Sequence, residues 1–217
     1  MPDGVERRYR RLFSAGDGVE RIAAYSDGVY AIAMTLLVLN LHIPTGTTSA
    51  FEVLVQEWPS YLGFALSFVI IAVSWVGHHR RFRVVTGHDT GLIVVNLVLL
   101  FFVVSLPFPT SLISEFAPET SAVIVYAAAV GLLEVAELVE WVYLRRRGLM
   151  RPEVDEGVYR YVLWSFVPTI VVFLGSIVVA LLAGGVPAMV SWWAIAILSP
   201  FIGRISARRI DRSAGPR

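Results

Sequence analysis

Six long runs of apolar residues, separated by short polar segments, dominate the chain. A helix needs about 20 mostly apolar residues to cross the hydrocarbon core of a bilayer. The runs are continuous, whereas the strands of a membrane barrel alternate apolar and polar residues. We therefore predict an all-α integral membrane protein with six transmembrane helices per subunit, over residues 22–43, 58–77, 91–113, 121–144, 161–183 and 186–204. The membrane domain then covers residues 21–204, between polar tails at 1–20 and 205–217.

The basic residues predict how the helices are oriented. All 18 are arginines, and they lie in the two tails, at the start of the first run, after the second run, between the fourth and fifth runs and after the sixth. The segments that follow the first, third and fifth runs contain none. Because cytoplasmic loops are enriched in basic residues, we predict that both termini are cytoplasmic and that the number of spans is even.

The loops on the opposite side are acidic. They carry Glu52, Glu57, Glu115 and Glu119. A negative outer rim would raise the local concentration of cations. The same pattern also arises where arginine is merely kept out of the outer loops, so both interpretations stay open.

Composition narrows the class of protein further. The chain is 217 residues long, 56% hydrophobic and 16% charged, whereas a soluble domain carries about 25% charged residues. This low share of charged residues argues against a soluble enzyme and against a nucleic-acid-binding protein. The sequence contains no cysteine, no Gly-x-Ser-x-Gly, no His-Glu-x-x-His and no phosphate-binding loop, so an enzyme is the least favoured class and no cofactor is expected.

The first run opens with charged residues where lipid disfavours them. On a helix, Arg21 and Tyr25 share a face, while Asp27 points about 120° away from Arg21. The two charges therefore cannot pair along one helix, and each is expected to reach another helix or subunit. For Asp27 two environments remain open: a buried site with a partner, or an interface wetted by headgroup water.

A second polar set lies at the same predicted depth, at the end of the second run and early in the third. It contains Trp75, His78, His79 and Asn96. A neutral imidazole or an amide there is expected to donate a hydrogen bond to Asp27. A zinc site is not expected, because adjacent helical residues point about 100° apart and no third ligand is evident.

Three glutamates follow one another in the fourth run. Glu134, Glu137 and Glu140 are spaced three residues apart. We expect Glu140 to lie at the interface beside the arginines that follow, and Glu134 near the membrane midplane. An intramembrane carboxyl at that depth can coordinate a cation or transfer a proton, or it can be a protonated or hydrogen-bonded carboxyl at a helix contact. A secondary transporter, whether or not it is coupled to protons, could be built on Glu134 and Glu137.

One face of the first run carries an apolar stripe with a single hydroxyl. Its members fall within about 100° of arc on a helix: Gly28, Ile32, Thr35, Leu36 and Leu39. Periodicity alone does not tell whether this stripe faces lipid, a neighbouring helix or water.

Three segments in order resemble one known family. They are Arg21-x-x-x-Tyr25-Ser26-Asp27-Gly28 with the run 31–39, Trp75-x-x-His78-His79-Arg80, and Asn96 followed by 100–102 and 106–110. Residues 21–113 thus resemble the bacterial relatives of a lysosomal potassium channel, transmembrane protein one-seven-five, whose signature is Arg-x-x-x-Phe-Ser-Asp. The chain departs from that pattern at Tyr25, where phenylalanine is usual, and at Asn40, where an acidic residue is frequent.

The resemblance implies a homotetramer in the inner membrane of a prokaryote, with the first helices lining one potassium-conducting pore. It implies that Ile32 forms an aliphatic constriction, extended by Leu36 and Leu39, and that Thr35 forms a hydroxyl ring. Gly28 lies on the same face. A polar network is implied to brace the pore helices: Arg21, Tyr25, Ser26, Asp27, Trp75, His78 and Asn96. Besides the secondary transporter, the remaining rival is a membrane scaffold that conducts no ions.

Overall fold

The computed structural model describes residues 18–44, 46, 49–195 and 198, all in helices and short connections apart from one isolated bridge. The helices are α2 (Gly18–Leu36), η1 (Leu37–Asn40), α3 (Ala50–Gln56), α4 (Trp58–Phe82), α5 (Thr90–Ser105), α6 (Pro107–Phe116), α7 (Thr120–Arg146), α8 (Glu156–Ala183) and α9 (Gly185–Ser191). The predicted all-α class is therefore confirmed. The two tails lie outside the described residues, apart from positions 18–20.

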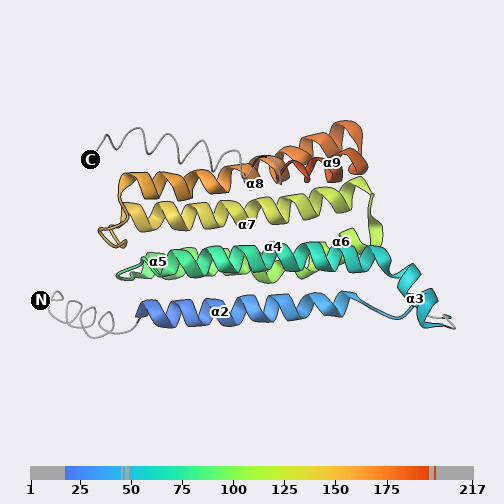
Figure 1. Cartoon of the computed structure of the whole chain (residues 1–217), viewed down its shortest axis with the longest axis horizontal. Helices are drawn as coiled ribbons and strands as arrows, with labels where there is room; N and C mark the ends of the chain where they lie inside the picture. Colours follow the sequence, from blue (N-terminus) through green and yellow to red (C-terminus); the bar gives the residue numbers. More distant parts are fainter. Residues whose placement is uncertain (1–17, 45, 47–48, 196–197, 199–217) are drawn as a thin grey trace, which may run out of the picture.

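Five stretches of the described residues are long and apolar enough to cross a membrane. They are Gly18–Asn40, Trp58–Phe82, Thr90–Phe116, Thr120–Arg146 and Glu156–Ala183. Their long helices run side by side along one axis (Figure 1). They overlap the first five predicted spans. Of the sixth, α9 covers the start, and most of the remainder lies outside the described residues.

The helices are bounded by the local signals that the sequence contains. Asp89 and Asp155 cap α5 and α8, each by accepting a hydrogen bond from a backbone N–H of the first turn. The third predicted span breaks at Leu106, because Pro107 cannot continue the hydrogen-bond ladder and instead opens α6. Gly184 ends α8 with a φ of 90°, a left-handed conformation that favours glycine.

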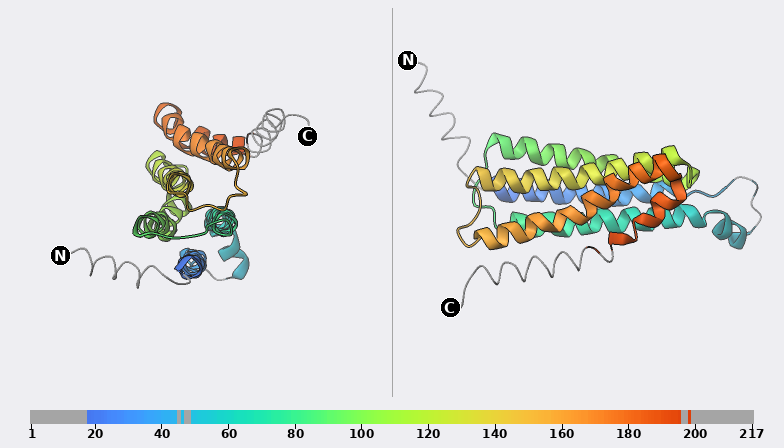
Figure 2. Two further views of the ribbon diagram at one scale, coloured as in Figure 1. Left: turned by 90° about the vertical axis from the view of Figure 1, so that its left-hand side faces the viewer. Right: turned by 90° about the horizontal axis from the view of Figure 1, so that it is seen from above.

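The pore-candidate helix α2 lies at one edge of the bundle, packed against α4 and α5, with α8 and α9 on the far side (Figure 2). The core contains Tyr30, Ala33 and Leu37 from this edge, all fully buried. At one end of the bundle, the α4–α5 and α7–α8 connections are joined by a bridge between Val85 and Met150. This end also holds the start of α2 (Figure 1).

Candidate functional site

Helix α2 has one covered face and one free face within the subunit. One row of residues at helical spacing is buried against α4 and α5. It consists of Ser26, Tyr30, Ala33 and, at the start of η1, Leu37. The other face is exposed, and it includes the whole predicted stripe: Gly28, Ile32, Thr35, Leu36 and Leu39. Packing of the described helices thus leaves all five of these residues exposed to some extent.

The exposed stripe is apolar apart from one hydroxyl oxygen, that of Thr35. Ile32 is 58% exposed, Leu36 39% and Leu39 72%. Between them the Thr35 hydroxyl donates to the carbonyl of Ile32 at 2.8 Å. Because its proton is used inside the helix, the Thr35 oxygen has lone pairs left to face outward.

The structure gives Asp27 a different partner from the one expected. The indole Nε1 of Trp75 on α4 donates to Asp27 Oδ1 at 2.8 Å. Donation by His78 or Asn96 was therefore the wrong expectation, although all three residues do lie beside the start of α2. Asp27 is half-buried, and Arg21 and Tyr25 lie on the exposed side of the same helix.

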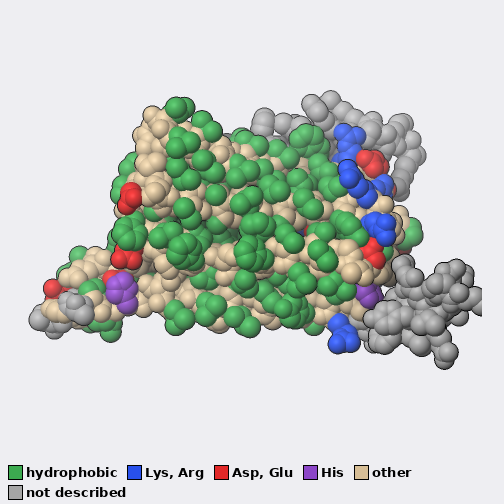
Figure 3. All heavy atoms as spheres, turned by 180° about the vertical axis from the view of Figure 1, so that it is seen from behind, with side chains coloured by type: hydrophobic (Ala, Val, Ile, Leu, Met, Phe, Trp, Pro, Cys, Tyr) green, Lys and Arg blue, Asp and Glu red, His purple; other side chains and the backbone are tan. Residues whose placement is uncertain are grey.

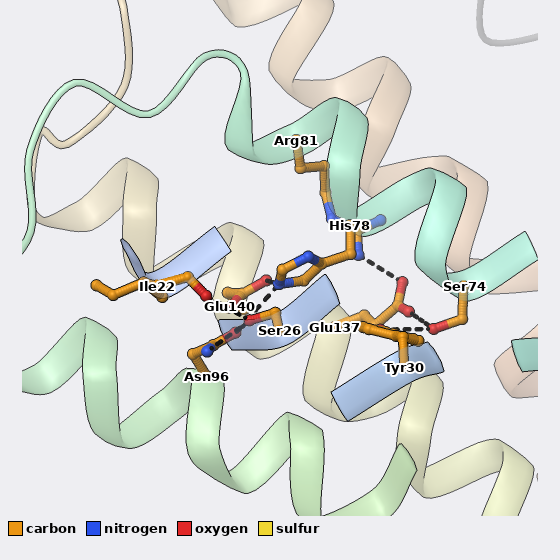
Figure 4. A network of polar contacts seen from close by, with 9 residues as sticks. All are labelled: Ile22, Ser26, Tyr30, Ser74, His78, Arg81, Asn96, Glu137 and Glu140. Atoms are coloured by element: carbon orange, nitrogen blue, oxygen red, sulfur yellow. Dashed lines mark hydrogen bonds and ion pairs between the residues drawn. The ribbon is translucent and has the colours of Figure 1, made fainter. Parts of the chain in front are cut away.

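His78 and Asn96 instead hold Ser26, as Figure 4 shows. The Asn96 amide donates to Ser26 Oγ at 3.0 Å, and Asn96 Oδ1 lies 3.1 Å from His78 Nε2. An amide oxygen accepts, so His78 carries its proton on Nε2. The Ser26 hydroxyl donates to the Ile22 carbonyl at 2.9 Å, which completes the chain.

A second polar connection reaches α2 one turn further along, and the sequence analysis missed it. The hydroxyls of Tyr30 and Ser74 lie 2.8 Å apart, and Ser74 donates to Glu137 on α7. Arg81 Nη2 donates to the same carboxylate at 2.6 Å, with both side chains buried. A signal was present: Ser74, His78 and Arg81 share one face of α4 at spacings of four and three residues.

The three glutamates of α7 have different surroundings. Glu137 is buried in the pair with Arg81, while Glu134 is half-buried one turn away. Glu140 has no exposed surface within the bundle, and its position near the membrane interface stays a prediction. The helix α7 continues to Arg146, and its rotation turns Glu140 inward, to a position 3.9 Å from His78 Nε2.

At the opposite end, polar contacts tie η1 to α6. Ser111 donates to Asn40 Oδ1 at 2.6 Å, and Asn40 Nδ2 donates to the Pro107 carbonyl at 3.3 Å. His42 Nε2 lies 3.6 Å from the buried Glu57 carboxylate. Among the described residues, no group of three or more histidine or acidic side chains could hold a metal ion.

The loop before α5 is held by one carboxylate. Asp89 accepts hydrogen bonds from the Leu92 N–H, the Tyr143 hydroxyl and Arg147 Nε, at 2.8, 2.8 and 2.9 Å. Burial raises the pKa of Asp89, but these three hydrogen bonds outweigh it and hold the pKa below its ordinary value.

The chain is similar to several known proteins. The family model described as endosomal/lysosomal potassium channel TMEM175 matches residues 21–107. A protein named potassium channel from Streptomyces collinus is 39% identical over 142 residues, which are 62% of this chain and 69% of that relative. Another, from Chamaesiphon minutus, is 46% identical over 100 residues, 44% of this chain and 49% of the relative.

A solved structure extends the likeness to most of the fold. It is the crystal structure of a lysosomal potassium-selective channel TMEM175 homolog from Chamaesiphon minutus, which is 28% identical and superposes with a TM-score of 0.70. The match covers 88% of this chain and 99% of that one. These relatives are named as channels and not as enzymes. The chain is a multi-pass membrane protein and belongs to the TMEM175 family.

Proposed function

We propose that this chain is one subunit of a potassium-selective cation channel, in which four copies bring α2 around a central pore. The observation that carries the proposal is the free face of α2. An apolar stripe with one hydroxyl gains a role when copies of the helix converge, because the stripe then lines a shared axis. The names of the bacterial relatives support potassium as the permeant ion.

Four Ile32 side chains around an axis would form a narrow hydrophobic neck. Such a constriction closes to ions when water leaves it. The Thr35 hydroxyl donates its proton to the Ile32 carbonyl of its own helix, with the two oxygens 2.8 Å apart. Four such hydroxyls, one from each subunit, would therefore add four acceptor oxygens about one turn beyond the neck. A hydrophobic constriction distinguishes ions by the free energy needed to remove their water. We therefore expect the selectivity for potassium over sodium to be moderate.

The contacts on the covered face support this role, because they fix the rotation of α2. Trp75 holds Asp27 from α4, and Asn96 holds Ser26 from α5. Arg21 and Tyr25 are exposed at the same end and would contact a neighbouring subunit. These residues thus set which side of α2 stays free.

The arrangement of charge supports the predicted orientation. Exposed arginines gather, among some acidic side chains, at the end of the bundle that holds the start of α2, whereas the charged side chains seen at the other end are acidic (Figure 3). Because basic residues favour the cytoplasmic side, that end would be cytoplasmic, in the inner membrane of a bacterium. A sixth span, over residues 186–204, would return the chain to the same side.

The test is ion flux into liposomes that contain the purified protein. We expect potassium flux to exceed sodium flux, and Ile32→Asn to raise the flux and reduce the selectivity, because an amide wets the neck. Val171→Asn on α8 is the matched control, since Val171 and Ile32 are both 58% exposed. Unchanged flux in Ile32→Asn would show that α2 does not line the pore. Subunit counting is the second arm, and a monomer would contradict the proposal.

A further inference from the structure

Glu140 is buried without a hydrogen bond. The residue has no exposed surface, and neither carboxyl oxygen has a hydrogen-bond partner among the residues that the structure describes. His78 Nε2 lies 3.9 Å away, beyond hydrogen-bond distance, and is directed to Asn96 Oδ1 at 3.1 Å. The polar contacts that hold α2 do not use this carboxyl group.

The surroundings of Glu140 disfavour a negative charge. A buried carboxylate without donors costs several kcal/mol, and a bound proton removes that charge. The one guanidinium in the cluster, Arg81, already donates to Glu137 at 2.6 Å. The titratable and charged groups near Glu140, its neighbour His78 or the Arg81–Glu137 pair come from three helices: Asp27 and Tyr30 of α2, His78, His79 and Arg81 of α4, and Glu134 and Glu137 of α7.

We propose that Glu140 is a proton-binding site outside the pore, that it holds one proton per subunit at neutral pH, and that release of this proton reduces potassium flux. The site is defined by the enclosed carboxyl group, by the charge of Arg81 committed to Glu137 and by the single donor hydrogen of His78. The reduction of flux rests on the proposed channel function, whereas the binding of the proton does not.

His78 supplies the connection to the pore helix. Its Nε2–H faces two acceptors, the Asn96 amide oxygen at 3.1 Å and Glu140 Oε2 at 3.9 Å. While Glu140 is protonated, the amide receives this hydrogen. A carboxylate forms hydrogen bonds about twice as strong as those of a neutral acceptor, so release of the proton draws Nε2–H toward Glu140. Asn96 then loses a partner, and its hold on Ser26 of α2 weakens.

The fixed ring of His78 makes this exchange specific. The ring is stacked on Phe82, with centroids 4.3 Å apart, and Tyr30 lies against it at 5.6 Å. Since the ring is enclosed, a small tilt decides which oxygen receives the hydrogen. Tyr30 is also bonded to Ser74, which donates to Glu137, so α7 already reaches α2 through Glu137, one turn away from the contact that release of the Glu140 proton would change.

Infrared spectroscopy of the whole protein tests the proton. The spectrum at neutral pH should contain the carbonyl stretch of a protonated carboxyl group, and this band should weaken in Glu140→Gln. Glu156→Gln is the matched control, because Glu156 is a 65% exposed carboxylate bonded to Arg145, and it should keep the band. If Glu140→Gln does not fold, the wild type still decides: absence of any such band at neutral pH overturns the proposal.

Potassium flux into liposomes, at equal pH on both sides, tests the coupling. We expect the wild-type flux to fall severalfold from neutral to alkaline pH, and Glu140→Gln to keep its neutral flux, because the amide mimics the protonated carboxyl. Glu156→Gln should follow the wild type. An identical alkaline fall in Glu140→Gln, or no fall in the wild type, overturns the coupling. If the wild type shows no potassium flux at any pH, the proposed channel function is refuted. The infrared band still tests whether Glu140 binds a proton.

Discussion

The ion pair between Arg81 and Glu137 gives the sharpest test of the buried cluster. Arg81→Met keeps a flexible unbranched apolar stem and removes the charge, so the Glu137 carboxylate is left buried with Ser74 as its remaining donor. The side chains of Arg81 and Glu137 are 8% and 3% exposed, so water does not replace the lost partner. Removing one member of such a pair costs about 3–5 kcal/mol.

Thermal unfolding in detergent, followed by tryptophan fluorescence, measures this cost. For a chain of this size, each kcal/mol shifts the unfolding temperature by about 2–4 °C, so Arg81→Met should unfold about 6–20 °C below the wild type. Arg83→Met is the matched control. Arg83 lies two residues further along and is exposed, so its replacement should cost less than about 0.5 kcal/mol.

A double variant separates the cost of an unpaired charge from the value of the pair. Replacing both residues, with Arg81→Met and Glu137→Leu, leaves no buried charge at the pair and should recover most of the lost stability. If Arg81→Met instead unfolds at the same temperature as Arg83→Met, then Arg81 contributes no more to stability than an exposed arginine does. The described geometry of the cluster would then be wrong.

Three further predictions concern other parts of the site. Trp75→Phe removes the donor to Asp27 and should destabilise the proposed oligomer by about 0.6–2 kcal/mol, seen as dissociation in size-exclusion chromatography that a Trp58→Phe control does not show. Asp89→Ala removes the cap of α5 and should cost about 1 kcal/mol at neutral pH. Because the pKa of Asp89 is lowered, its stabilisation is present above the ordinary aspartate pKa and lost as the pH falls through the lowered value; a difference in unfolding temperature from the wild type that persists in acid would contradict this. Glu134→Gln should leave potassium flux nearly unchanged in a channel, whereas loss of flux would favour the secondary transporter.

The apolar runs predicted where the long helices lie, but not where they end. Hydropathy registers the length of apolar sequence, whereas a helix continues through polar residues wherever its backbone hydrogen bonds can form. The second run was predicted to end at residue 77, yet α4 extends to Phe82 and thereby carries His78 and Arg81 into the bundle. Likewise α8 begins at Glu156, five residues before the predicted span, because Asp155 caps it there.

The sequence predicted the apolar stripe of α2 but not which side of the helix the subunit would cover. Helical geometry alone placed Ile32, Thr35 and Leu36 on one face. Which face the subunit covers depends on the positions of α4 and α5, and these follow from packing over long sequence separations. The pair of Arg81 and Glu137 was missed for a related reason. The positive-inside rule counts arginines in a segment, and it does not distinguish Arg81, which is buried, from Arg80 and Arg83, which are exposed.

Helix α4 fixes the rotation of α2, and this links the cluster to the free face. Ser74 is bonded to Tyr30 and Trp75 to Asp27, while His78 reaches Ser26 through Asn96. Residue numbers fall on α2 as they rise on α4, as they must for antiparallel neighbours held in one register. A slip of one residue would turn α2 by about 100° and carry Ile32 from the free face toward the flank of the bundle. Since three separate contacts oppose that slip, loss of one should loosen α2 without reorienting it. The polar residues of α4 therefore specify the rotation of a helix whose free face they do not touch.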